Sequence, residues 1–281
     1  MTMKITILVD NTAIIDKYYL AEPGFAAWVE DGDTRILFDC GYSDIILRNA
    51  DIMGIDILTA DAIVFSHGHQ NHTWGLIPIL ERVTSRAVLG HQTKNFRFIG
   101  HPASFWSRKI FGIPEIGPLL SPERLSSFGD VIGSCDARYL TDRMIFLGEI
   151  PSLFSFDQRH EQGTLYTPDG PVPDLIPDDS ALTLQTSEGL VILTGCAHAG
   201  ICSIIEKAKA VTGEDRIRDI IGGFHLYQSS PDTISQVTRY LESIHPVELH
   251  PCHCTGQLAT RAFADLVSRD ETGVGTVLEY L

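Results

Sequence analysis

Histidines follow the ends of several separate apolar segments in this chain, and this feature constrains the fold more than any other. The densest example is residues 66–72, Ser-His-Gly-His-Gln-Asn-His, directly after the strand-like run 61–65. The same arrangement returns at His198, His225 and His253. Because α/β proteins place their chemistry at strand ends, the pattern predicts that these imidazole rings meet on one shared edge.

Apolar and amphipathic segments alternate in an order typical of layered α/β proteins. Strand candidates lie at 3–9, 25–30, 34–39, 61–66, 144–150, 181–186, 190–194, 217–221, 247–250 and 275–280. Helix candidates lie at 43–52, 73–83, 201–211, 233–243 and 257–267. Hairpin signals early and late in the chain give two β-rich halves covered by helices. This order predicts an α/β fold built as a four-layer αββα sandwich, with residues 1–281 in a single domain.

The segment 91–143 has a different character from its surroundings. It is rich in proline, glycine and aromatic residues, and its periodicity is poor. We expect an inserted, lid-like segment rather than a layer of the core. It is either a solvated loop with its aromatics packed beneath it, or a lid that offers cations and stacking faces to a substrate. The candidate substrate-binding residues are Lys94, Arg97, Phe105, Trp106, Arg108 and Lys109.

Charge and composition exclude several classes of protein. The formal net charge of −15 disfavours nucleic-acid binding through a basic face. No apolar run reaches the about 20 residues that cross a bilayer, and the N-terminus lacks the pattern of a signal peptide. Six cysteines are too sparse for a disulfide framework in a chain of 281 residues. We therefore expect a cytoplasmic protein with reduced thiols and a small-molecule partner, while a homo-oligomer stays open.

The histidines predict a metal centre, because imidazole is a common ligand of zinc and also suits iron. Metal-assisted hydrolysis needs three or four protein ligands and an open position for water. His67, His69 and His198 could hold a primary ion. A second ion could be held by His72, Asn71 and one of His225 or His253. We expect one or two divalent ions, with zinc first and iron or manganese as alternatives.

Several motifs give the chain a family resemblance. Residues 66–72 resemble the His-x-His-x-Asp-His signature of the metallo-β-lactamase-fold superfamily, and Leu-Phe-Asp-Cys-Gly at 37–41 resembles its upstream Asp motif. Gly-Cys-Ala-His-Ala-Gly at 195–200, Gly-Gly-Phe-His-Leu at 222–226 and His-Cys-Thr-Gly at 253–256 resemble a narrower subgroup. It is the group of 7,8-dihydropterin-6-methyl-4-(β-D-ribofuranosyl)aminobenzene 5'-phosphate synthase-like metal-dependent hydrolases. The resemblance covers nearly the whole chain and implies an αββα fold, a mono- or dinuclear metal site and support of that site by Asp39.

The chain departs from the superfamily signature at one position, where Asn71 replaces the aspartate. A neutral amide supplies no negative charge, so we expect a weakened, altered or empty second metal position. Cys196 stands where many relatives carry a metal-bridging aspartate, and its thiolate could compensate. Cys252 and Cys254 form a Cys-x-Cys pair, which fits either metal binding, disulfide cycling or two reduced thiols near a turn.

These features predict an enzyme, a metal-dependent hydrolase or transferase. It would use metal-activated water on a small anionic ester or phosphoester, with pterin- or ribosyl-phosphate-related compounds as candidates. One alternative is an iron-dependent redox or oxygen-handling protein on the same fold. Another is a ligand-binding protein in which Asn71 has disabled the second metal position.

Overall fold

A sandwich of sheets and helices forms the body of the computed structural model, which describes residues 2–268 and 270–281. A first sheet has the strand order β16-β1-β2-β3-β4-β5-β7, and a second has the order β15-β14-β13-β12-β9-β8. The first consists of β1 Met3–Val9, β2 Ala26–Asp31, β3 Thr34–Phe38, β4 Ala62–Val64, β5 Phe96–Gly100, β7 Gly129–Gly133 and β16 Val277–Tyr280. The second consists of β8 Arg138–Tyr139, β9 Met144–Phe146, β12 Ala181–Thr186, β13 Gly189–Thr194, β14 Ile217–Gly223 and β15 Glu248–Cys252.

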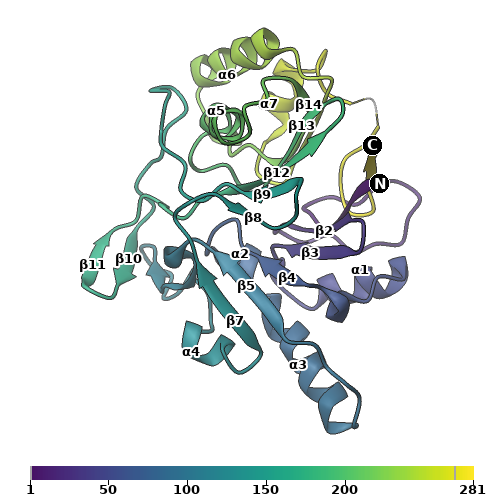
Figure 1. Ribbon diagram of the computed structural model, residues 1–281. Helices are drawn as coiled ribbons and strands as arrows, with labels where there is room; N and C mark the ends of the chain where they lie inside the picture. The colour runs from purple at the N-terminus through teal and green to yellow at the C-terminus, as the bar shows by residue number, and fades with distance from the viewer. Residues whose placement is uncertain (1, 269) are drawn as a thin grey trace.

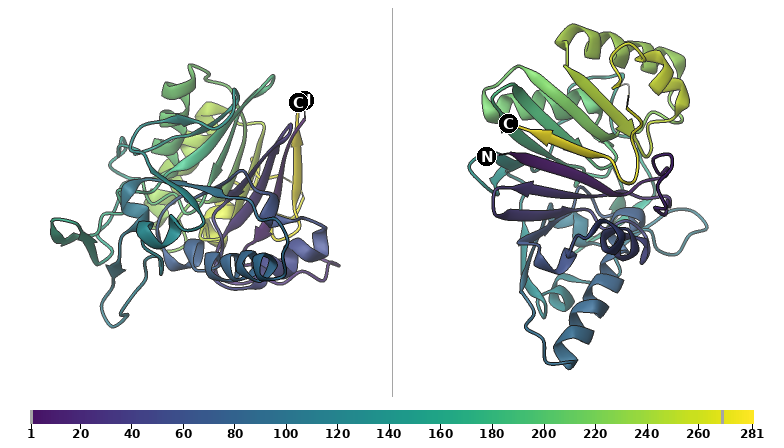
Figure 2. Two further views of the ribbon diagram at one scale, coloured as in Figure 1. Left: turned by 60° about the horizontal axis from the view of Figure 1, so that its bottom comes forward. Right: turned by 90° about the vertical axis from the view of Figure 1, so that its right-hand side faces the viewer.

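Helices cover the outer face of each sheet, as Figure 1 and the right-hand view of Figure 2 show. The first sheet is covered by α1 Ile45–Met53 and α3 Leu76–Val88. The second is covered by α5 Ile201–Thr212 and α6 Pro231–Ile244, with α7 Gln257–Ala262 beside them. Shorter turns of helix are α2 Gln70–Thr73, α4 Pro122–Leu125, η1 Ile57–Thr59 and η2 Pro102–Phe105. The layers confirm the predicted αββα fold class.

The two sheets share an apolar core between them. Ile5 and Phe38 from the first sheet belong to the same buried cluster as Phe146 and Leu193 from the second. The six residues of β13 are all buried, because one face meets the first sheet and the other meets the helices. A strand buried on both faces reads as a continuous apolar run, which is why this strand was visible in the sequence.

Parallel pairing brings the functional loops to one edge. In the first sheet β3 pairs in parallel with β4. In the second, β13, β14 and β15 run in parallel with one another. The carboxyl ends of parallel strands share an edge, so the loops that leave these five strands start close together within each sheet. The predicted histidines follow four of these strands, and Asp39 follows the fifth.

The expectation for residues 91–143 is wrong in part. Residues 96–100 and 129–133 are the strands β5 and β7 of the first sheet, not an insertion over the core. Phe96, Phe98 and Ile99 of β5 are buried, whereas β7 is only partly covered and has glycine at both ends, so neither short strand gives a strong local signal. Only the part between the two strands leaves the sheet. It contains β6 Arg108–Lys109, which pairs with β10 Thr164–Thr167 beside β11 Gly170–Pro173.

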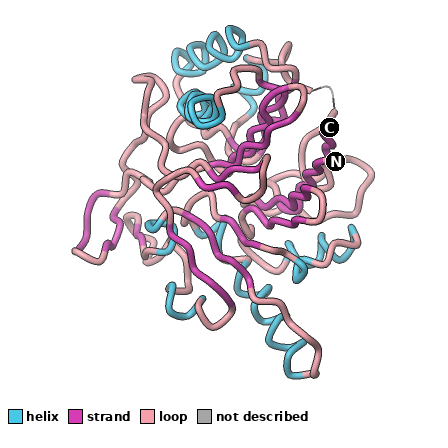
Figure 3. Tube along the Cα trace, in the orientation of Figure 1, coloured by secondary structure: helices cyan, strands magenta, loops and turns pink. Residues whose placement is uncertain are grey.

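The small sheet β11-β10-β6 projects from the sandwich on the left of Figure 3. Helix boundaries also differ from expectation. The helix expected at 73–83 is α3, which begins at Leu76 and continues to Val88, and the last helix ends at Ala262 rather than near residue 267. None of the helices in the described part of the chain is long and apolar enough to span a bilayer.

Candidate metal centre

Asp39 ties two of the histidines to the end of β3. Its Oδ1 accepts a hydrogen bond from the Ser66 backbone N–H at 2.7 Å, and its Oδ2 accepts from Ser66 Oγ at 2.6 Å. Oδ2 also lies 2.7 Å from His72 Nδ1. Because a carboxylate only accepts hydrogen bonds, Nδ1 of His72 carries the proton and Nε2 keeps its lone pair. This carboxylate–imidazole contact is the arrangement that orients histidine ligands of metals.

Ser66 fixes the neighbouring ring of His67 in the same way. The Ser66 hydroxyl gives its proton to Asp39, so it accepts from His67 Nδ1, 2.9 Å away. The lone pair of His67 Nε2 then points into the centre, where His69 Nδ1 lies at 2.9 Å. The loop that carries Ser66 and the loop that carries Cys196 pack closely against each other. A Cβ atom on Gly195 would lie 2.1 Å from Ser66 Oγ, so the approach of the Cys196 loop requires glycine.

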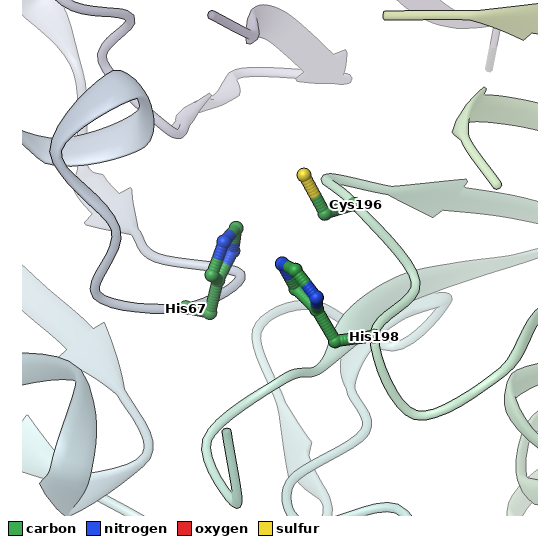
Figure 4. A group of neighbouring side chains, drawn as sticks. All are labelled: His67, Cys196 and His198. Atoms are coloured by element: carbon green, nitrogen blue, oxygen red, sulfur yellow. The ribbon is translucent and has the colours of Figure 1, made fainter. Parts of the chain in front are cut away.

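Cys196 is shared by three groups of candidate metal donors. Within the described residues its sulfur belongs to the sets His67–Cys196–His198, His72–Cys196–His253 and Cys196–His225–Cys254, and in each set the ligand atoms lie within 4.8 Å of one another. We call the first two the histidine-rich sets. The sulfur lies 3.2 Å from both His72 Nε2 and His253 Nε2. Figure 4 shows Cys196 beside His198 on the loop after β13, with His67 on a neighbouring loop.

Buried ring nitrogens without partners indicate that these residues fit a metal. His69 Nε2 and His198 Nε2 are buried and make no hydrogen bond. A buried polar atom without a partner is costly in a folded protein, and a metal ion accepts an imidazole lone pair. Burial, and then the neighbouring imidazoles, lower the pKa of His67 and His198 well below its usual range. Neutral imidazoles are the form that coordinates metals.

His253 is held at the second histidine-rich set by a segment that the sequence did not single out. Its Nδ1 lies 2.8 Å from Asn11 Oδ1, which leaves the Nε2 lone pair facing Cys196. Its backbone N–H donates to Asp10 Oδ1 at 2.8 Å. The amide nitrogen of Asn71 lies 3.4 Å from His253 Nε2. Asn71, which replaces the aspartate of the superfamily signature, therefore does lie at the centre, beside His253.

His198 and His225 meet through another residue that carried no signal in the sequence. Gln162 Nε2 lies 3.2 Å from His198 Nδ1 and 3.4 Å from His225 Nε2. The two rings lie 4.1 Å apart between centroids. Gln162 belongs to a long connection without regular periodicity, so only tertiary structure could bring it here. The structure thus brings both His225 and His253 to the centre, in different donor sets.

A pair of aspartates holds the two histidine loops by accepting hydrogen bonds from their backbone N–H groups. Asp178 accepts from the Gly68 N–H at 2.7 Å, and Asp179 accepts from the Ala199 N–H at 2.8 Å. Burial raises the pKa of Asp179 to about 7, against the effect of its backbone hydrogen bonds. The signal in the sequence was a pair of acids directly before the buried strand β12, a position where charge is unexpected.

Arg108 is used inside the protein rather than offered to a substrate. Its side chain is fully buried, and Nη2 donates to Asp178 Oδ1 at 3.0 Å and to the Ala103 carbonyl at 2.9 Å. Burial alone would raise the pKa of Asp178, but the Arg108 guanidinium outweighs it and lowers that pKa. This placement does not support the expectation that Arg108 binds substrate, because its guanidinium holds the Asp178 carboxylate that accepts from the Gly68 N–H.

The other candidate substrate residues also lie apart from the histidines. Lys94 pairs with Asp61, and Arg97 donates to the Asp61 carbonyl, at the amino end of β4, which is opposite to the histidine loop. Lys109 is exposed, with its Nζ 5.1 Å from the centre of the Tyr166 ring. Phe105 packs edge-on against Phe65 in the core, and the half-buried Trp106 follows it in the same turn. In this structure Lys94 and Arg97 lie together beside Asp61, and Lys109 lies apart from them beside Tyr166.

Comparisons with known proteins show which family the chain resembles. The profile of the metallo-beta-lactamase superfamily matches residues 20–211. Uncharacterized protein MJ0448 of Methanocaldococcus jannaschii is 30% identical over 268 residues, which are 93% of this chain and 94% of the relative. The 7,8-dihydropterin-6-methyl-4-(beta-D-ribofuranosyl)-aminobenzene-5'-phosphate synthase of the same organism is 27% identical over 248 residues, 84% of this chain and 80% of the relative.

A solved structure shows the same architecture over almost the whole length. Tm1679, described as a metal-dependent hydrolase of the beta-lactamase superfamily, superposes with a TM-score of 0.81 at 25% sequence identity, covering 98% of each chain. The matched segment 20–211 contains Asp39, the histidine loop at 67–72, and the Cys196 loop. The chain belongs to the metallo-beta-lactamase superfamily.

Proposed function

We propose that this protein is a metal-dependent hydrolase that cleaves a small ester or phosphoester with water. The observation that carries the proposal is the convergence of strand-end histidines on Cys196, with buried ring nitrogens that have no protein partner. A purely structural histidine cluster would satisfy those nitrogens with hydrogen bonds.

The residues that would hold the ions follow from the donor sets. His67 and His198 would hold one ion with Cys196, and His72 and His253 a second with the same sulfur. His69 belongs to neither set, but its buried and unpartnered Nε2 makes it a further candidate for the first ion. When bound, a divalent ion acts as a Lewis acid and makes water nucleophilic near neutral pH. The net charge of −15 repels anions, so an anionic substrate depends on this local positive charge.

The protein's own groups prepare the centre. Asp39 holds the His72 ring with its Nε2 turned inward, and Ser66 does the same for His67. Burial keeps both rings away from bulk water, where a proton would compete for the lone pair. Asp179 holds the loop that carries His198 through the Ala199 N–H. Each of these contacts reduces the rearrangement needed when ions and substrate bind.

The substrate class is supported by the named relative. That relative is a synthase whose product combines a dihydropterin with a ribosylaminobenzene phosphate. We propose an anionic small molecule of this kind, a pterin or ribosyl phosphate, with group transfer in place of hydrolysis if an amine or aromatic nucleophile replaces water. No nucleic acid or membrane is involved in this proposal.

The test is turnover by the zinc-loaded protein of a phosphomonoester, a phosphodiester and a carboxylic ester, each with a chromogenic leaving group. We expect hydrolysis of at least one of them by the natural chain and its loss in His198→Ala. His91 is exposed and lies outside the centre, so His91→Ala is the matched control and should retain the activity. Equal turnover by both variants, or turnover that does not depend on added metal, would contradict the proposal.

An iron-dependent redox function is a second candidate, because more than one sulfur lies at the centre. Cys196 and Cys254 both belong to one donor set, and thiolates suit iron as well as zinc. Visible absorption that bleaches on reduction of the iron-loaded protein, together with no hydrolysis by the zinc form, would favour this candidate. A colourless zinc protein with hydrolytic turnover would remove it.

A further inference from the structure

Cys254 lies at the centre although it belongs to neither histidine-rich set. It follows β15, and its sulfur lies 3.4 Å from the carbonyl oxygen of Cys196, which follows β13. His225, which follows β14, completes the group, and the ligand atoms of Cys196, His225 and Cys254 all lie within 4.8 Å of one another. The ends of three adjacent parallel strands therefore supply one donor each.

The backbone around this group is shaped for close approach. A Cβ atom on Gly223 would lie 2.6 Å from Cys254 Sγ and 2.5 Å from the Gly195 carbonyl, so only glycine leaves room for the sulfur. His225 and His253 both have φ of 51°. Residues other than glycine seldom adopt this left-handed conformation, and such strain concentrates at functional sites. The backbone therefore adopts a strained left-handed conformation at His225 and at His253, after β14 and β15.

The donors themselves are of the kind that binds thiophilic metals. Two sulfurs and one imidazole nitrogen form a Cys2His set, which zinc accepts with a fourth position left open. His225 Nδ1 is buried without a hydrogen-bond partner. Cys252, only two residues away, belongs to no donor set found in the described part of the chain, although it is also a buried free thiol. The convergence is therefore specific to Cys254.

We propose that Cys196, His225 and Cys254 form an additional metal position, a Cys2His set for a thiophilic divalent ion such as zinc. It shares Cys196 with the histidine-rich sets and rests on the metal centre of the proposed function, but it does not require that centre to be hydrolytic. Binding replaces the S–H protons with metal–sulfur bonds and releases those protons to solvent, with no change of oxidation state. The position also gives the Cys-x-Cys pair a metal-binding role carried by Cys254 alone.

Cobalt substitution tests this directly, because thiolate–cobalt bonds absorb in the near ultraviolet and imidazole–cobalt bonds do not add to that band. The full-length protein would be stripped of metal, loaded with cobalt and compared with Cys254→Ser and with the matched control Cys252→Ser. We expect Cys254→Ser to lose part of the thiolate band and one equivalent of bound metal. Cys252→Ser should match the natural chain in both.

A measurement on the natural chain keeps the test independent of how the variants fold. X-ray absorption of the zinc-loaded protein should show sulfur neighbours at about 2.3 Å from more than one cysteine per centre. A zinc environment with a single sulfur, or identical cobalt spectra for the two variants, would overturn the proposal while the histidine-rich sets remain. Failure of the natural chain to bind either metal would overturn the proposed function and this additional position together.

Discussion

Replacing Asp39 by asparagine isolates the contribution of one carboxylate that binds no metal itself. Asparagine has the same shape, and it tolerates the left-handed φ of 57° at this position, so the backbone should be retained. It can still accept from the Ser66 N–H through its oxygen. Its NH2 group, however, would face His72 Nδ1 and Ser66 Oγ, which the carboxylate now accepts from at 2.7 and 2.6 Å.

The predicted loss follows from the state of the His72 ring. With an amide N–H opposite Nδ1, the ring proton moves to Nε2, the atom that faces Cys196 at 3.2 Å. The lone pair is then no longer available to a metal. Loss of such a supporting contact lowers metal affinity by about 10–100-fold. This corresponds to about 1.4–2.7 kcal/mol for the ion that His72 holds.

Competition with a chromophoric chelator would measure the affinity for each zinc equivalent. Asp61→Asn is the matched control, because it is the same exchange at the opposite end of β4, where Asp61 pairs with Lys94 on the surface. We expect the control to bind zinc as the natural chain does. Unchanged affinity in Asp39→Asn, or a loss equal to that of the control, would refute the argument that Asp39 orients His72.

Three further predictions concern other parts of the centre. Asn71→Asp should tighten binding of a second ion by about tenfold, since it adds a charged oxygen beside His253. Equilibrium dialysis with metal analysis would measure this affinity. A fall in turnover would mean that the natural amide belongs to the working site. Burial raises the folded-state pKa of Asp179 from 3.8 to about 7, so the metal-free protein should lose stability as pH rises through that interval. Asp179→Asn should flatten this dependence in urea unfolding, and parallel curves for the two proteins would contradict it. Gly195→Ala should destabilise the fold by about 1–3 kcal/mol, because its methyl group meets Ser66 and Asp39, and thermal unfolding would detect this.

Much of the layer structure could be predicted from local pattern. The strands β12, β13 and β14 are apolar runs bounded by turns, and α5 and α6 keep a helical period, so their positions agree within a few residues. The strands β5 and β7 were missed because they are short and lie beside proline and glycine. Their identity depends on pairing, of β5 with β4 and of β7 with β5, rather than on any local preference.

The use of charged residues could not be predicted from the sequence. Lys94 and Arg108 stand close together in the chain, yet one pairs on the surface with Asp61 and the other is fully buried against Asp178. Which carboxylate a cation meets depends on how distant segments cross. The same holds for Gln162 and Asn11, whose contacts with the histidines join loops that are far apart in the sequence.

The sequence by itself determined the αββα layers and singled out strand-end histidines as candidate metal donors. Apolar runs of strand length must be buried, and a histidine directly after such a run is carried to the edge of a sheet. Only the tertiary structure decided how the donors are grouped around Cys196, and that Cys254 joins them while Cys252 does not. The physical reason is that the grouping depends on ångström-scale distances between loops from different strands, which are set by the packing of one sheet against the other.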